Sequence, residues 1–381
     1  MEKGIATDWK VNKEGRLGSL DVLRSLAMFM VVVLHYLGKG EILGSLTEGP
    51  LDMLHSMAWI LETLCIVAVN VYMLLSGYFV SGSSFKLSRL IGLWVQLEIY
   101  SVGVGLLSVV CGWIPAESVD TYFLLGLLFP VSMGHYWFMT AYLYFYIIWA
   151  IIAPGVRKMD QKQFLAVLGC LFFFFCGIKS FLPVRFELDQ KGYDCLWYLC
   201  MFLLGAYIRR FGFPILKKKW SCLVLYLVSC GLIFLGTLVL QGIYLQNGSF
   251  SYVLTLFYEY NHLFNVLASV GLFGLFLYWK APEGLGRVFG KIAPYTLGVY
   301  LLHENQGLRY VWQNWLGADN IQSPIGLVVG VLIASTVVFM AGIAIDWCRS
   351  KVTSVSEGLL GLIPLYRSLK KRIYEADLYF K

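Results

Sequence analysis

Ten apolar stretches, each near the length that crosses a bilayer, constrain the fold of this chain more than any other feature. Backbone groups inside a bilayer must be hydrogen-bonded within the protein, so an apolar stretch of about 20 residues is typical of a transmembrane helix. The sequence therefore predicts an all-α integral membrane protein, a bundle of about ten transmembrane helices. The stretches are 19–38, 56–80, 88–112, 135–154, 163–182, 193–210, 220–241, 255–279, 289–310 and 322–347. Residues 119–130 are too short to span, which predicts a re-entrant or interfacial piece.

The composition agrees with a membrane location. Hydrophobic residues make up 59% of the 381 residues and charged residues 14%, against roughly 25% charged residues in an average soluble domain. The nine cysteines form no C-x-x-C pair and no Cys/His cluster with zinc spacing, so we expect no metal site. No basic and aromatic module resembles a nucleic-acid-binding domain, so we expect no nucleic-acid partner.

The placement of lysine and arginine predicts the orientation. With ten spans both termini share one side, and twenty-four of the thirty basic residues flank that side, against five on the other, with Arg24 alone inside a span. Because basic residues are enriched in cytoplasmic segments, we expect both termini in the cytoplasm of a multi-pass plasma-membrane protein, of bacterial origin. The predicted parts are a cytoplasmic segment, 1–18, a ten-helix membrane domain, 19–347, and a basic amphipathic tail, 348–381, on the cytoplasmic surface of the lipid bilayer.

The first span contains ionisable residues, in the stretch DVLRSLAMFMVVVLH over 21–35. At about 100° per residue, the eleven steps from Arg24 to His35 bring both to one helix face, about 20° apart around the helix and about 16 Å apart along it. Asp21 lies three residues before Arg24, close enough to pair with it. An ionisable group left to lipid costs at least about 2.5–3.5 kcal/mol, so this face is expected to line a cavity. The alternatives are a snorkelling Asp21–Arg24 pair and a His35 that only bonds a neighbouring helix.

The other histidines fall on the same side of the predicted membrane as His35. His303, followed by Glu304, lies near the outer end of the ninth span, and His135 with Trp137 opens the fourth. His303 and Glu304 are candidates to bind an acceptor or to orient His35. His135 and Trp137 are candidates to hold a sugar ring, although aromatic residues at a span entrance are commonly part of an interfacial belt.

Four segments together resemble the membrane acyltransferase family 3. They are the R-x10-H spacing of the first span, NVYMLLSGYFVSG at 70–82, HYWFMTAYLYFY at 135–146 and APYTLGVYLLHEN at 293–305. The resemblance covers nearly the whole chain. It implies a ten-helix core that moves an acyl group, usually acetyl, from cytoplasmic acyl-CoA to a hydroxyl of a cell-envelope glycan or another extracytoplasmic acceptor. Acyl-CoA is then a substrate, and no permanently bound cofactor is expected.

The resemblance also implies a donor site at the cytoplasmic start of the third span. The family has R-x-x-R there, whereas this chain has Lys86 and Arg89 in FKLSR. Lysine binds phosphate as a point charge and arginine as a fork, so the replacement weakens the role carried over to Lys86. The resulting hypothesis has Arg24, Lys86 and Arg89 bind the phosphates of acyl-CoA (acetyl-CoA), while His35 deprotonates the acceptor hydroxyl.

Two other functions remain open from the sequence. A multi-pass transporter or exporter of a small polar or envelope-precursor substrate also buries charges on one helix face. Many transporters, however, have paired halves with interrupted helices at matching positions, and this chain shows no such repeat. A membrane scaffold without catalysis is consistent with everything except the shared face of Arg24 and His35.

Overall fold

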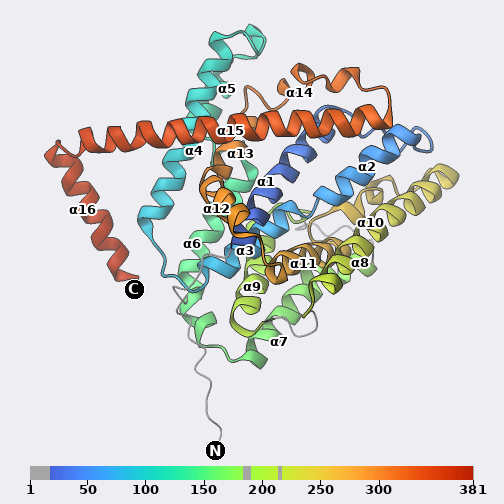
Figure 1. Cartoon of the computed structure of the whole chain (residues 1–381), viewed down its shortest axis with the longest axis horizontal. Coiled ribbons are helices and arrows are strands. Elements are labelled where there is room, and N and C mark those ends of the chain that lie inside the picture. The colour runs from blue at the N-terminus through green and yellow to red at the C-terminus, as the bar shows by residue number, and fades with distance from the viewer. Residues whose placement is uncertain (1–17, 183–189, 213–216, 381) are drawn as a thin grey trace, which may run out of the picture.

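The computed structural model describes residues 18–182, 190–212 and 217–380, and within these ranges the regular structure is entirely helical (Figure 1). The predicted cytoplasmic segment, 1–18, lies outside the described residues except for Gly18. The all-α prediction is therefore confirmed for the described part of the chain.

Eight helical segments of the described chain are long and apolar enough to cross a membrane. Five are single helices: α1 (Gly18–Lys39), α4 (Leu87–Val110), α6 (Trp137–Lys158), α10 (Lys219–Asn247) and α15 (Pro324–Leu360). Three are composite: α2 (Met53–Cys65) with α3 (Ala68–Val80), α7 (Gln161–Phe172) with a π-helical turn and α8 (Ile178–Phe181), and two short 3-10 turns with α11 (Leu263–Tyr278). These helices make the chain a multi-pass membrane protein.

The other two predicted spans differ from the prediction. The 193–210 stretch forms α9 (Cys195–Phe211), a buried helix of 17 residues, which is shorter than the eight. The 289–310 stretch does not form one continuous helix. It is divided between α12 (Glu283–Ile292), a 3-10 turn and α13 (Thr296–His303). Pro294 lies in that turn, where it has no N–H to donate and its ring prevents α12 from continuing.

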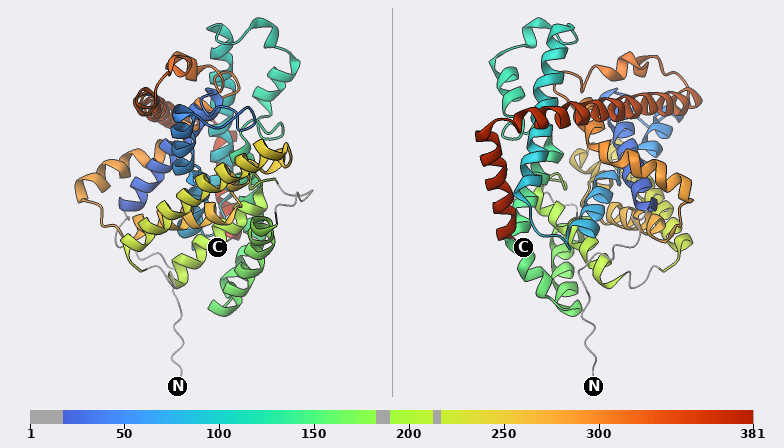
Figure 2. Two further views of the ribbon diagram at one scale, coloured as in Figure 1. Left: turned by 90° about the vertical axis from the view of Figure 1, so that its right-hand side faces the viewer. Right: turned by 60° about the vertical axis from the view of Figure 1, so that its left-hand side comes forward.

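Helix α1 lies in the middle of the bundle and carries the charged stripe. It packs against α2, α3, α12, α13 and α15, and Figures 1 and 2 show it surrounded by these later elements. Most of its residues are buried, including Asp21 and Ser25. Because α1 contacts helices from both halves of the chain, its polar face meets side chains that are distant in sequence.

The short elements flank this core. Helix α5 (Thr121–Leu128) has eight residues, too few to cross a bilayer, and it is capped by Asp120, whose carboxylate accepts the Phe123 N–H. Its re-entrant or interfacial position remains a prediction. Helix α14 (Trp312–Trp315) follows α13. Helix α15 runs for 37 residues, past the predicted domain boundary at 347, and is about 55 Å long. Helix α16 (Pro364–Tyr379) then folds back toward the start of α4 (Figure 2).

Close packing of α13 on α15 depends on Gly342. A Cβ atom added there lies 2.6 Å from the Val299 Cα, which is too close for any real contact. We expect Gly342→Ala to displace α13 and to lower the stability by about 1–3 kcal/mol, measured as the melting temperature in detergent. Gly231→Ala is the matched control, because a Cβ there meets nothing within 4 Å and alanine is the better helix former. Equal melting temperatures for the two variants contradict this account.

Candidate active site

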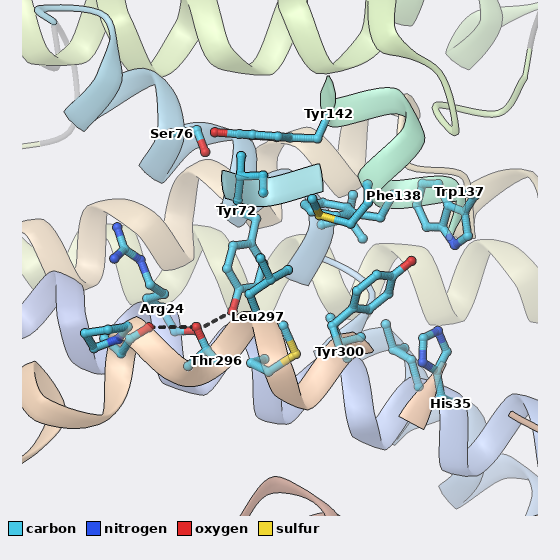
Figure 3. Close-up of a pocket in the computed structure, with 18 of the residues that line it drawn as sticks. Arg24, His35, Tyr72, Ser76, Trp137, Phe138, Tyr142, Thr296, Leu297 and Tyr300 are labelled. Carbon is cyan, nitrogen blue, oxygen red and sulfur yellow. Dashed lines mark hydrogen bonds between the residues drawn. The ribbon is translucent and has the colours of Figure 1, made fainter. Parts of the chain in front are cut away.

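A cavity of about 230 Å³ lies beside α1 and is lined by both Arg24 and His35. Figure 3 shows the two side chains at opposite ends of it. The helix face that Arg24 and His35 share, predicted from their eleven-residue spacing, therefore lines a cavity. The other lining residues come from α1, α3, α4, α6, the segment before α11 and the 293–300 segment, and they are Met28, Val31, Leu34, Val69, Tyr72, Ser76, Arg89, Leu93, Trp137, Phe138, Met139, Tyr142, Tyr260, Ala293, Pro294, Thr296, Leu297 and Tyr300.

At one end of the cavity, His35 lies against His303 and Glu304. His35 Nδ1 is 2.8 Å from His303 Nε2 and 3.3 Å from Glu304 Oε1. His303 and Glu304 are almost fully buried. They come together with His35 because α13 ends at this level of α1, so residues 268 positions apart in the sequence share one hydrogen-bonded cluster.

The hydrogen bonds of His303 determine which nitrogen of His35 is free. His303 Nδ1 lies 2.6 Å from the Val299 carbonyl oxygen, which can only accept, so Nδ1 carries the proton. In a neutral His303, Nε2 is then an acceptor, and His35 Nδ1 donates to it. Neutral His35 therefore keeps an unprotonated Nε2, the form that a general base requires.

Basic side chains surround the buried carboxylate. Lys39 lies one helical turn after His35 and forms an ion pair with Glu304. Arg309 donates to the Glu304 carbonyl oxygen at 3.2 Å and to the His135 carbonyl oxygen at 2.6 Å. A buried charge requires a partner of this kind. The Lys39–Glu304 pair therefore stabilises a negative charge next to His35.

Of the two predicted acceptor residues on α6 and before it, only Trp137 is among the described residues that line the cavity. Its ring lies near Tyr260, with centroids 6.0 Å apart in a stacked arrangement, and near Tyr193 at 4.5 Å. His135 instead contributes its backbone carbonyl to Arg309. The structure thus brings Trp137, but not the His135 ring, to the cavity that His35 lines.

The opposite end of the cavity is positively charged. Arg24 and Arg89 line it, and no carboxylate does so among the described residues. The Arg24 backbone carbonyl accepts from the Tyr72 hydroxyl at 2.8 Å, and its guanidinium carbon lies 5.8 Å from the centre of the Phe79 ring. Arg89 donates to the Tyr142 hydroxyl at 3.3 Å.

Two predictions about this end are not met by the geometry. The ion pairs between described residues do not include one between Asp21 and Arg24, so the expected pair is not formed, and Asp21 is buried on α1. Lys86 precedes α4 and does not line the cavity within the described chain. Its backbone N–H donates to the Tyr146 hydroxyl at 3.1 Å.

The sequence predictions do not include several residues of the site. Lys39 and Arg309 are two of the five basic residues on the predicted outer side, and Lys39 lies four residues after His35, therefore on the same helix face. Tyr300 lies one turn before His303 and lines the cavity. No local pattern distinguishes Tyr72, whose role depends on the packing of α3 against α1.

His35, His303 and Glu304 also offer three ligand atoms within 4.8 Å of one another, a spacing that suits a metal ion. Two features favour a proton-transfer cluster instead. His303 Nε2 and His35 Nδ1 already bond to each other. The Lys39 ammonium forms an ion pair with the Glu304 carboxylate, and the positive charge of Lys39 opposes the binding of a further cation.

The sequence of this chain matches the model of a known protein family. Residues 17–344 match the model of the acyltransferase domain of acyltransferase family 3, which is well over half of the chain. No curated protein and no solved structure gives a significant match. On the extent of the family match, the chain is a member of acyltransferase family 3, and it is a membrane-embedded acyltransferase.

Proposed function

We propose that this acyltransferase moves a short acyl group, such as acetyl, from cytoplasmic acyl-CoA to a hydroxyl of an extracytoplasmic cell-envelope glycan. In this proposal the protein resides in a bacterial plasma membrane with both termini in the cytoplasm. The single observation that carries the proposal is the cavity that has Arg24 and Arg89 at one end and His35 at the other.

The charged end suits the phosphates of the donor. Guanidinium groups bind phosphate through charge-assisted, bidentate hydrogen bonds, and Arg24 and Arg89 face a cavity with no carboxylate among its described lining residues. A proton-coupled carrier is expected to bury carboxylates along its pathway. The lining therefore favours an anionic substrate over proton-coupled transport.

The middle of the cavity suits a thin arm. Its lining includes Met28, Val31 and Leu297, and its volume of about 230 Å³ is below the roughly 300–1,000 Å³ of sites that enclose a whole small molecule. We infer that the nucleotide remains at the arginine end and that only the pantetheine arm enters. About 16 Å separates Arg24 from His35 along α1, so the arm carries the thioester to the imidazole.

The chemistry follows from the state of His35. Its Nε2 accepts the proton of the acceptor hydroxyl while the hydroxyl oxygen attacks the thioester carbonyl. The C–S bond breaks, the CoA thiolate leaves, and the imidazolium returns the proton to that thiolate. Glu304 Oε1, 3.3 Å from His35 Nδ1, stabilises the imidazolium, and His303 holds the tautomer. We therefore assign His303 and Glu304 to the orientation of His35.

The acceptor enters at the same end. Trp137 and Tyr260 expose their rings to the cavity, and aromatic faces suit the apolar face of a sugar ring. The test is mass analysis of envelope polysaccharides from cells with and without the gene. We expect an acyl mass that is absent without the gene and absent with Arg24→Ala. Polysaccharides of the same mass in cells with and without the gene contradict a glycan acceptor.

Donor binding gives a second expectation. We expect Arg24→Gln to raise the KM for acetyl-CoA by about 10-fold to 100-fold, which corresponds to the loss of a hydrogen bond to a charged group. Purified protein in nanodiscs and release of CoA thiol provide the measurement. Arg287→Gln is the control, since Arg287 is exposed and its ion pair within the described chain is with Glu283. Equal KM values for the two variants contradict a donor site at Arg24.

A further inference from the structure

Helix α16 packs against the beginning of α4, next to the arginine end of the cavity. Helix α15 carries the chain away from the bundle, and α16 returns beside α4, as the right-hand view of Figure 2 shows. The family match ends at residue 344, and α16 lies beyond the matched residues.

Asp377 of α16 caps α4. The residue that precedes α4, Lys86, provides no side-chain cap. Asp377 Oδ1 accepts the Ser88 backbone N–H at 3.1 Å, and Oδ2 accepts the Ser88 hydroxyl at 2.5 Å. A carboxylate at this position satisfies one of the free amides of a helix start and interacts well with its positive dipole end.

The burial and charge of Asp377 agree with this role. Only 7% of the residue is exposed. Burial raises the pKa of its carboxyl group. The hydrogen bonds from Ser88 and from the Leu87 N–H, with the charge of Lys86, together outweigh burial and bring the pKa below the ordinary value. The carboxylate is thus charged at neutral pH, the form that caps a helix best.

A second contact continues from α16 to Arg89. The Phe380 ring lies 4.8 Å from the Phe85 ring, which in turn lies 5.0 Å from the Tyr146 ring. Tyr146 accepts the Lys86 N–H at 3.1 Å, and the Arg89 guanidinium lies 5.5 Å from the centre of the Tyr146 ring. The segment from Phe85 to Arg89 is therefore held between α16 on one side and α6 on the other.

We propose that Asp377 is a positioning residue for the donor: by capping α4 it fixes the first turn of that helix and so aims Arg89 into the cavity. The inference rests on the proposed binding of acyl-CoA at the arginine end. Asp377 itself does not line the cavity within the described chain, and it acts through Ser88 and the backbone of α4.

The test is binding of acetyl-CoA to the full-length protein in nanodiscs, measured by calorimetry, which needs no acceptor. We expect Asp377→Ala to weaken binding by about 5-fold or more, because alanine removes the helix cap that asparagine would keep. The control is Glu375→Ala, which removes a carboxylate from the same helix at an exposed position whose ion pair among the described residues is with Lys371. We expect that variant to bind as the wild type does.

A double-variant cycle separates positioning from general destabilisation. If Asp377 acts through Arg89, Asp377→Ala has little further effect once Arg89→Gln is present. An equal loss of affinity in both backgrounds overturns the inference, as does wild-type affinity in Asp377→Ala. A wild-type protein that binds no acetyl-CoA refutes the proposed function instead. If Arg89→Gln weakens binding and Asp377→Ala does not, this inference alone is refuted.

Discussion

His35→Gln is expected to reduce acyl transfer by about 10²–10⁴-fold, the range that a general base contributes. Glutamine retains a hydrogen-bonding side chain of similar size, but it cannot take up a proton near neutral pH. The measurement is release of CoA thiol from acetyl-CoA by protein in nanodiscs, with envelope polysaccharide as the acceptor. Acetyl-CoA binding is expected to persist, because Arg24 and Arg89 lie at the other end of the cavity.

His55→Gln is the matched control for this variant. His55 lies outside the cavity among the described residues and bonds Asp52, with 2.8 Å between His55 Nδ1 and Asp52 Oδ1. The same substitution there is expected to leave the rate unchanged. A His35→Gln protein that is present at normal levels and transfers acyl groups at the wild-type rate contradicts the general-base role and leaves His35 as a packing residue.

Glu304→Gln is expected to affect both stability and rate. It leaves Lys39 next to a neutral amide, and an uncompensated buried charge costs about 3–5 kcal/mol. Since 19% of the Lys39 side chain is exposed, we expect a loss of stability at the lower end of that range, detected as a lower melting temperature in detergent. The rate is expected to fall as well, because the amide no longer stabilises the imidazolium of His35.

A double variant separates these two effects. Glu304→Gln with Lys39→Met removes both charges and replaces the ammonium with an apolar side chain of similar length. Replacing a buried ion pair with apolar groups is often neutral for stability, so the melting temperature is expected to recover while the rate remains low. If the rate recovers together with the melting temperature, Glu304 has only a structural role.

These predictions assign separate roles to the two ends of the cavity. The arginine end is built from α1 and α4 and is supported by α16, while the histidine end is built from α1 and α13. In the proposed reaction, the donor and the acceptor approach from opposite ends of this cavity. Variants at one end are expected to change donor binding, and variants at the other the rate of transfer.

Much of the membrane architecture was predictable from the sequence, because the physics is local. Eight of the predicted spans appear as helices of sufficient length, since about 20 apolar residues in a row have few alternatives in a bilayer. The common face of Arg24 and His35 was also predictable, because the helical repeat alone determines it. Their roles in catalysis remain predictions.

The errors occurred where local patterns compete with packing. The 289–310 stretch is apolar enough to span, yet Pro294 divides it, and the resulting short α13 places His303 against His35. Asp21 has the right spacing to pair with Arg24, but the described residues show no ion pair between them, and the Arg24 guanidinium lies near the Phe79 ring of α3. Spacing along one helix determines which pairs are possible, and the neighbouring helices determine which of them form.

The sequence by itself determined the helical membrane fold and the single stripe from Arg24 to His35, because hydrophobic length and helical periodicity are properties of one segment. Only the tertiary structure decided what that stripe faces. The contacts of His35 with His303 and Glu304, and of Asp377 with Ser88, join residues more than 260 positions apart. Such contacts depend on how whole helices pack, and no spacing within a single helix encodes them.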